Sequence, residues 1–289
     1  MRVRIYQLNV NRDEQMLKFC NHEKFVKKGG LDPSKYDCVF HGDLEATSLD
    51  DVYNILNADK KPGTYQGHSL SVSDVVEIIG DIPKVYGRVE FFDQKGNVYD
   101  WVECSNKEEL DALVRDSFEH AQVCKPVVYE EGAELAVPGM FFCEPAGWQP
   151  ISFDTTKCGK MQGVRALMIQ PGKSPVEVGV IDDLEGWQRA VSEPGERGLM
   201  EVTYPFEDNA VMVGNEEAKL IGMKGNRRIY DSVYAGPLFI VGDDGEGEFC
   251  DLTDEQIKVY SKKFENPEDI SDEEVQNDLG YRIIGFLMS

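Results

Sequence analysis

The second half of the chain is organised around residues 204–230, which read Tyr-Pro-Phe-Glu-Asp-Asn-Ala-Val-Met-Val-Gly-Asn-Glu-Glu-Ala-Lys-Leu-Ile-Gly-Met-Lys-Gly-Asn-Arg-Arg-Ile-Tyr. An apolar run over residues 210–213 is followed by Gly214-Asn215, two residues that tolerate a positive φ. A second apolar run ends at Ile221. The pattern predicts a strand, a turn and a second strand.

The densest group of polar side chains in the chain lies on and after this turn. Turns display side chains to solvent rather than packing them, so these residues are candidates for binding a ligand or a partner. The candidates are Asn215, Glu216, Glu217, Lys219, Asn226, Arg227 and Arg228. The alternative is a solvated hairpin with ordinary surface charges. No motif with a fixed mechanism occurs here, so the spacing names no reaction.

This region resembles a known family. The pattern that carries the resemblance is Tyr204-Pro-Phe206, Asn215 to Leu220, Asn226-Arg227, and Ala235-Gly236 before residues 238–242. It is similar to an uncharacterised domain family of bacterial conjugative elements and phages, over about residues 164–268. The resemblance implies an accessory protein of a mobile element and no known chemistry.

Length and charge restrict the possible functions. A chain of 289 residues exceeds the usual size of one domain, and its 41% hydrophobic residues suffice for a core. The net charge of −23 disfavours direct binding to nucleic acid or to an anionic membrane. A host protein with a basic surface, a cation or a small ligand in a pocket remains favoured.

Targeting signals and cysteine pairs are missing from the sequence. The seven cysteines are scattered and never form Cys-x-x-Cys, which favours buried, reduced thiols. The first residues contain no apolar targeting region, and no apolar run is long enough to span a membrane. We therefore expect a cytoplasmic protein in a bacterial host.

The first eighty residues alternate between strand and helix patterns. Strands are expected at residues 3–8 and 36–40, with helices that begin after Asn21 and after Ser48. Ser73-Asp74 predicts a turn into a buried strand over residues 75–79, because both side chains can bond the local backbone.

These elements resemble the YodL-like domain. The residues that carry the resemblance are Ile5 to Leu8, Tyr36 to Val39, Leu49 to Tyr53 and, most specifically, Gly67-His-Ser-Leu-Ser-Val-Ser-Asp-Val-Val76. The resemblance implies a role in interaction or counter-defence and names no target. Within the motif, His68 beside Ser69 and Ser71 is a conceivable catalytic base, but a hydrogen-bonded structural histidine is the favoured interpretation.

The rest of the chain predicts a middle segment and a second domain. A hairpin over residues 85–102, a helix from the capping box Ser105–Glu108, and strands at 127–129, 140–143 and 148–153 form the middle segment. Helices after Asp182 or Asp183 and after Thr253 accompany strands at 164–169, 199–204 and 237–241. We predict an α+β fold of mostly antiparallel sheets with helices on one face, divided into residues 1–82, 85–155 and 164–289.

Acidic residues concentrate near the end of the chain. The candidates for an acidic interaction surface are Asp243, Asp244, Glu246, Glu248, Asp251, Asp254, Glu255, Glu268, Asp269, Asp272, Glu273 and Glu274. Most acidic stretches are solvated helix faces. The functional alternative is a surface that imitates nucleic acid for a basic partner. Residues 281–288 are apolar enough to return as a strand or docked segment.

Catalytic and metal-binding motifs are missing from the sequence. It contains no zinc signature, nucleophile elbow or phosphate-binding glycine loop. Residues 243–248 place glycines where a calcium loop needs oxygen ligands, which favours a hairpin turn. We therefore expect no enzyme activity, no cofactor and no metal.

Three functional hypotheses follow. The first is a mobile-element protein that binds and neutralises a host protein, such as a nucleic-acid-processing defence enzyme, through its acidic surface. The second is a protein that binds or sequesters a small nucleotide signal, with Asn215, Lys219 and residues 226–228 facing the phosphate and Tyr204 or Tyr230 stacking on the base. The third, an enzyme with a site assembled from distant residues, ranks last.

Overall fold

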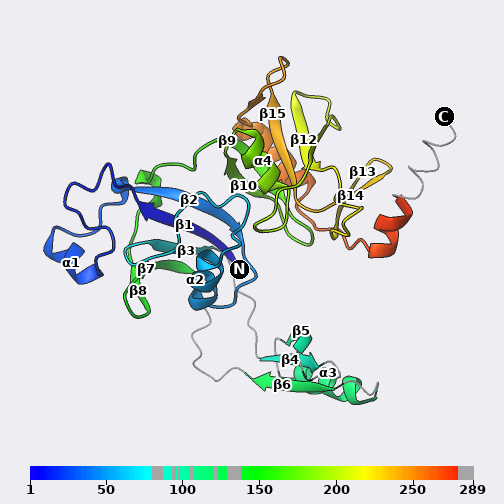
Figure 1. Ribbon diagram of the computed structural model, residues 1–289, viewed down its shortest axis with the longest axis horizontal. Helices are drawn as coiled ribbons and strands as arrows, with labels where there is room; N and C mark the ends of the chain where they lie inside the picture. Colours follow the sequence, from blue (N-terminus) through cyan, green and yellow to red (C-terminus); the bar gives the residue numbers. More distant parts are fainter. Residues whose placement is uncertain are drawn as a thin grey trace.

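The computed structural model describes residues 1–79, 87–92, 96, 98–104, 107–119, 123–128 and 138–278. The predicted α+β class is confirmed, since the described strand pairs within the sheets are antiparallel and the sheets are open (Figure 1). No helix among the described residues is long and apolar enough to cross a membrane.

The first sheet has the strand order β2-β1-β3-β7-β8. Its elements are β1 (Arg2–Leu8), α1 (His22–Lys27), β2 (Tyr36–Asp43), α2 (Leu49–Asn57), β3 (Val75–Ile79), β7 (Gly139–Cys143) and β8 (Trp148–Ile151). Asn21 caps α1, and Ser48 forms a capping box with Asp51 at the start of α2. The predicted elements of the first eighty residues are therefore confirmed.

Both faces of the first sheet are covered. Val52 and Leu56 of α2 pack with Ile5 and Phe40 on one face. Phe25 of α1 packs on the opposite face. The prediction of helices on one face is thus wrong for this sheet, because both faces of its central strands carry apolar side chains.

A small three-stranded sheet is inserted in the sequence between β3 and β7 of the first sheet. It has the order β5-β4-β6, with β4 (Gly87–Phe92), β5 (Val98–Cys104), α3 (Lys107–Glu119) and β6 (Cys124–Val128). The predicted hairpin is confirmed, while the expected cap at Ser105 lies outside the described residues. The middle segment was predicted to reach residue 155, but β7 and β8 belong to the first sheet. The physical reason is that β7 pairs with β3, which buries the side chain of Phe142 fully in the core of the first sheet.

The second sheet has the order β10-β9-β15-β12-β11, and β16 pairs with β15. Its elements are β9 (Val164–Ile169), β10 (Val176–Val180), α4 (Leu184–Ala190), β11 (Met200–Thr203), β12 (Ala210–Asn215), β15 (Leu238–Asp243), β16 (Phe249–Cys250) and α5 (Asp254–Lys263). Trp187 of α4 packs on one face and Tyr260 of α5 on the other. The prediction that helices cover one face is therefore wrong for the second sheet as well, because both faces of this sheet carry apolar side chains.

The hairpin predicted around Gly214-Asn215 does not form. β12 continues through both residues and pairs with β11, so Gly214 and Asn215 lie within a strand. Residues 216–222 form the turn, and Leu220 and Ile221 on it are exposed rather than packed in a strand. The next strands, β13 (Gly225–Ile229) and β14 (Ser232–Ala235), pair only with each other in the described structure. The prediction that residues 281–288 return as a strand or docked segment concerns residues outside the described part of the chain.

The first domain covers the free edge of β10. Carbonyl oxygens point outward from alternate residues along this edge, at Pro175 just before the strand and at Glu177 and Gly179 within it. They accept hydrogen bonds from Arg2 (3.5 Å), from Nδ1 of His41 (2.7 Å) and from Nε2 of Gln66 (2.9 Å), respectively. Unbonded backbone groups of an edge strand are costly when they are shielded from water. These three side chains therefore join the two domains.

Replacing Gln66 by Ala tests this junction. Gln66 also bonds the carbonyl and amide groups of Gln162, so the variant loses three hydrogen bonds, each worth roughly 0.5–1.5 kcal/mol. We expect faster hydrogen exchange in a peptide covering residues 159–166, because it contains the Gln162 amide that donates to Gln66 Oε1. Gln149→Ala is the control, because among the described residues the Gln149 side chain bonds only the neighbouring Pro150 carbonyl. Equal exchange in both variants would contradict this role of Gln66.

Candidate functional site

Two of the residues predicted to face a ligand are buried. Asn226 is fully buried and donates to the carbonyls of Ile169 and Gly236, each at 2.7 Å. Arg227 is 1% exposed, and its guanidinium donates to backbone carbonyls that include Lys173 (2.8 Å) and Phe264 (3.2 Å). Burial lowers the pKa of Arg227. Both side chains hold backbone segments together and face no open surface.

Asn215 also has a structural role. It is 4% exposed; its Nδ2 donates to Val191 O at 3.4 Å, and its Oδ1 accepts from Glu217 N at 2.9 Å. The side chain thereby starts the turn after β12. Of the predicted constellation, this leaves Glu216, Glu217, Lys219 and Arg228 outside the core.

The acidic end of the chain neutralises the two remaining cations. Lys219 pairs with Asp278, and Arg228 pairs with Glu274 and lies 3.8 Å from Glu268. Residues 272–278 form a helix that lies beside the turn, where Gln276 Nε2 donates to Lys219 O at 3.2 Å. The structure therefore joins two stretches that the sequence suggested as separate sites.

The predicted acidic residues separate into two groups. Asp243, Asp244, Asp251, Asp254, Glu268 and Glu274 form hydrogen bonds or ion pairs within the chain. The side chains of the others are exposed and form no hydrogen bond or ion pair with another described residue: Glu246, Glu248, Glu255, Asp269, Asp272 and Glu273. Glu246 and Glu248 lie on the β15–β16 turn, as the sequence predicted for that loop.

One part of this region combines apolar and acidic side chains. Leu220 and Ile221 are 64% and 56% exposed on the turn after β12. Glu216 and Glu217 begin the same turn, and the adjacent helix presents Asp272 and Glu273 to solvent. We call Glu216, Glu217, Leu220, Ile221, Asp272 and Glu273 the acidic–apolar surface. Sequence reasoning missed its apolar part, because Leu220 and Ile221 fitted a strand pattern.

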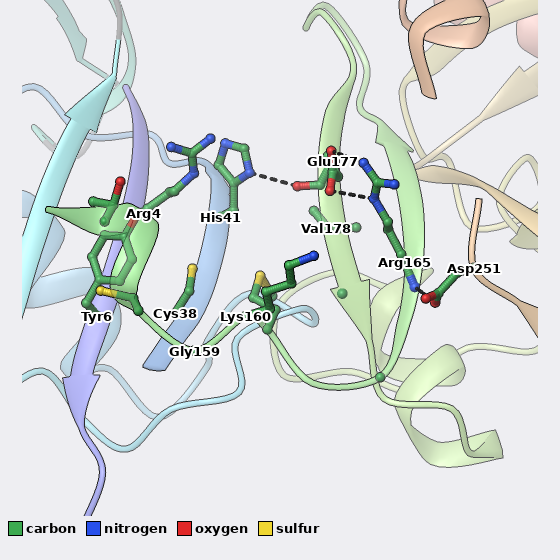
Figure 2. A pocket seen from close by; sticks show the side chains of 15 residues that line it. Arg4, Tyr6, Cys38, His41, Gly159, Lys160, Arg165, Glu177, Val178 and Asp251 are labelled. Carbon is green, nitrogen blue, oxygen red and sulfur yellow. Dashed lines mark hydrogen bonds and ion pairs between the residues drawn. The ribbon is translucent and has the colours of Figure 1, made fainter. Parts of the chain in front are cut away.

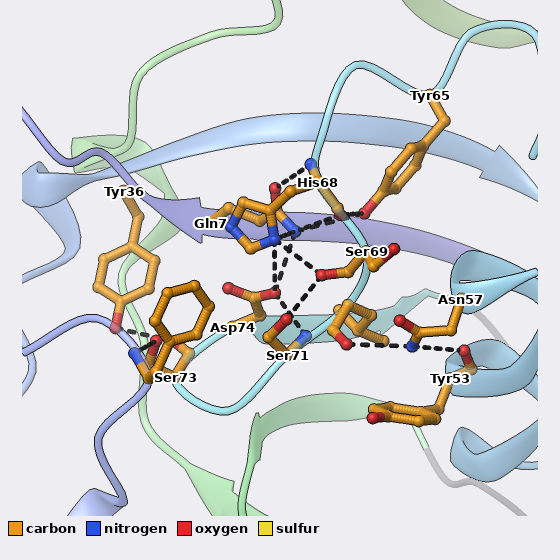
Figure 3. Close-up of polar contacts among 12 residues, drawn as sticks. Gln7, Tyr36, Tyr53, Asn57, Tyr65, His68, Ser69, Ser71, Ser73 and Asp74 are labelled. Atoms are coloured by element: carbon orange, nitrogen blue, oxygen red, sulfur yellow. Dashed lines mark hydrogen bonds and ion pairs between the residues drawn. The ribbon is translucent and has the colours of Figure 1, made fainter.

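The most specific YodL-like residues build a buried polar network around Asp74 (Figure 3). Asp74 is fully buried, and its Oδ2 accepts from Gln7 Nε2 (3.0 Å) and from Ser71 N (2.8 Å). Gln7 also bonds both backbone groups of His68. A Cβ on Gly67 would lie 2.5 Å from Gln7 Oε1, which explains the glycine. Burial raises the pKa of Asp74 to about 8.

His68 is part of this network rather than a catalytic pair. Its Nδ1 lies 2.7 Å from Ser69 O, and the Ser71 hydroxyl donates to the same carbonyl at 2.7 Å. The Ser71 hydroxyl is therefore not paired with the imidazole as a nucleophile would be, and no bond from the Ser69 hydroxyl to the ring occurs in the described structure. Burial also lowers the pKa of His68, which keeps the ring neutral near pH 7. The geometry agrees with a structural histidine.

A cavity of about 350 Å³ lies at the domain junction (Figure 2). It is lined by both domains and by their connection, and Arg4, Lys160 and Arg165 contribute cationic side chains. Arg165 is already paired with Glu177 and Asp254, whereas Lys160 has no ion-pair partner among the described residues. No sequence signal pointed to this cavity, because its walls come from segments up to about 250 residues apart. No cluster of His, Cys, Asp and Glu suited to a metal occurs in the part of the chain that is described.

Comparison with known families finds one match in each half of the chain. Residues 2–96 match the YodL-like domain, and residues 164–265 match the Domain of unknown function (DUF3846). The chain carries these two domains in that order. Asp74 and Gln7 thus lie in the YodL-like domain, and the acidic–apolar surface extends from the DUF3846 domain into the helix that follows it. Searches of curated proteins and of solved structures found no match.

Replacing Asp74 by Asn tests the buried carboxyl group. An aspartate in an unfolded chain has a pKa near 4. The folded protein therefore keeps a proton between about pH 4 and pH 8 that the unfolded chain releases, and the free energy of unfolding falls as pH rises through this window. Urea unfolding at pH 5, 6.5 and 8 should show a smaller decline for Asp74→Asn.

The matched control for this prediction is Asp272→Asn, which changes an exposed carboxylate that bonds no other described residue. It should keep the decline of the wild type. His68 acts in the opposite direction, since its lowered pKa adds stability as pH rises, and it is present in all three proteins. Parallel curves for the wild type and Asp74→Asn would show that Asp74 does not titrate in this window.

Proposed function

We propose that the chain is an accessory protein of a mobile genetic element that binds a basic host protein and neutralises it. The observation that carries the proposal is the acidic–apolar surface. Protein interfaces typically have an apolar centre and a polar rim, and Leu220 and Ile221 beside exposed carboxylates have this composition. The sequence resemblance to a family of conjugative elements and phages supports the mobile-element setting.

Electrostatics support a basic partner. Residues 164–278 contain 26 Asp and Glu but only 11 Lys and Arg, so much of the net charge of −23 belongs to this domain and its acidic end. Such a field attracts cationic surfaces and accelerates association at low salt. Proteins that process nucleic acid present basic surfaces to phosphate, and a defence enzyme of this kind is the target that we propose.

A matched pair of triple variants tests the acidic–apolar surface. The test variant is Leu220→Ser with Asp272→Asn and Glu273→Gln. The control is Leu184→Ser with Glu246→Gln and Glu248→Gln, which has the same net charge and also loses one exposed leucine. Neutral replacements are used because a Lys at Asp272 or Glu273 would oppose the dipole of the helix that begins there.

The measurement is affinity capture from a bacterial lysate across a salt series. We expect the wild type and the control to recover a basic nucleic-acid-handling protein, with recovery falling as salt rises. The test variant should recover at least tenfold less. If both variants lose recovery equally, net charge rather than this surface is responsible, and if neither loses any, the proposed surface is wrong.

A second candidate function is the binding of a small phosphate-bearing ligand, such as a nucleotide. The junction cavity favours it, since its volume is within the usual range for ligand sites and Lys160 is available for an anion. The residues that the sequence suggested for this role are less suitable, because Asn226 and Arg227 are buried and Lys219 is paired.

Lys160→Gln tests this second candidate. Isothermal titration with guanosine monophosphate should give saturable binding to the wild type, with the dissociation constant raised at least fivefold in the variant. Lys258→Gln is the control, since Lys258 is exposed and also has no ion pair among the described residues. Absence of saturable binding to the wild type would exclude this nucleotide from the cavity.

A further inference from the structure

The loop between β1 and α1 exposes two large apolar side chains. Met16 is 81% exposed and Phe19 is 60% exposed. The loop lies at the end of the molecule opposite the DUF3846 domain (Figure 1), so that domain does not cover them. Contiguous exposed apolar groups on a folded domain often mark a site of interaction.

The backbone holds both residues in an unfavourable conformation. Met16 has φ 51° and Phe19 has φ 65°, in the left-handed region that L-residues other than Asn and Gly seldom adopt. Burial of their side chains does not offset this strain, since both are exposed. Residues kept in such conformations are concentrated at functional sites, where the surrounding structure fixes them.

Specific hydrogen bonds fix this conformation. The buried carboxylate of Asp13 accepts from Leu17 N (2.9 Å) and from Lys18 N (2.8 Å). Phe19 N donates to the hydroxyl of Ser73 at 3.0 Å, which ties the loop to the Asp74 network. Leu17, between the two exposed residues, is buried in the core. The loop is therefore anchored on both sides of Lys18 while Met16 and Phe19 face solvent.

The charge around this loop is opposite to that of the chain. The first 35 residues contain eight Lys and Arg against four Asp and Glu, although the whole chain has a net charge of −23. Lys18 Nζ lies 5.3 Å from the centre of the Phe19 ring. Lys24 Nζ lies 3.1 Å from Cys20 Sγ, and that sulfur lies 3.8 Å from Met16 O. Neither lysine has an ion-pair partner among the described residues.

We propose that Met16, Lys18, Phe19 and Lys24 form a docking surface for a second partner protein, which presents an apolar pocket with acidic residues at its rim. Charge complementarity favours this occupant, because the two lysines flank the exposed apolar side chains. An anionic membrane is disfavoured, since its extended negative surface would also face the acidic remainder of the chain, whereas the acidic rim of one pocket would face only the two lysines. The protein would then bind a basic partner at one end and an acidic partner at the other.

The proposal can be tested with random peptides. Dodecapeptides displayed on phage are selected against the immobilised full-length chain. We expect two classes: basic peptides that depend on Leu220, and peptides that combine Asp or Glu with Leu, Phe or Trp. The second class should bind Met16→Gly/Phe19→Gly at least tenfold more weakly than wild type, and should bind the control Leu184→Ser equally well. The basic peptides test the acidic–apolar surface and the acidic peptides test the loop, so either proposal can fail without the other.

Thermal unfolding of the double variant shows whether a loss of peptide binding results from misfolding. Glycine adopts positive φ without strain, so Met16→Gly/Phe19→Gly should keep or raise the midpoint of unfolding while it loses peptide binding. Selection of no acidic peptides, or equal binding of such peptides to the double variant, would overturn the docking surface. Flotation with phosphatidylglycerol vesicles that depends on Met16 and Phe19, without selection of acidic peptides, would assign the loop to a membrane and also overturn the proposal.

Discussion

The relative position of the two large sheets depends on hydrogen bonds between side chains of the first domain and the backbone at the β10 edge. Three side chains from the YodL-like domain occupy successive outward carbonyls, as a neighbouring strand would, but they leave space for the junction cavity. Burial lowers the pKa of His41 to about 4, so the neutral ring can donate from Nδ1 to Glu177 O at ordinary pH. Because this contact joins the two large sheets, it determines where the exposed surfaces of the two domains face.

Local signals explain which parts of the fold could be predicted from the sequence. Ser48, Asp183 and Thr253 cap their helices as expected, because a cap depends on residues within one turn. The prediction of a turn at Gly214-Asn215 was wrong. Pairing with β11 and the bond from Asn215 to Val191 override the preference of these two residues for a turn. The placement of β7 and β8 could not be predicted either, because β7 joins the first sheet by pairing with the distant strand β3, and β8 pairs with β7.

The candidate site shows the same limit. Sequence identified polar residues after β12 and acids near the end of the chain, but ion pairs such as Lys219–Asp278 join residues that are 59 positions apart. Burial separates Asn226 and Arg227, which hold backbone carbonyls, from Glu216 and Glu217, which reach solvent. The exposed apolar residues were the least predictable part, because an apolar side chain on a strained or tight turn has the same sequence signature as one in the core.

We infer that the two domains form one body, which would hold the two proposed interaction surfaces at opposite ends of the molecule. Residual dipolar couplings of backbone amides in the deuterated full-length protein test it most directly. If the junction holds, couplings from residues 1–79 and from residues 164–278 fit a single alignment tensor with the domain orientation shown in Figure 1. Two tensors that differ in magnitude or direction would show that the domains move independently, and would contradict the account.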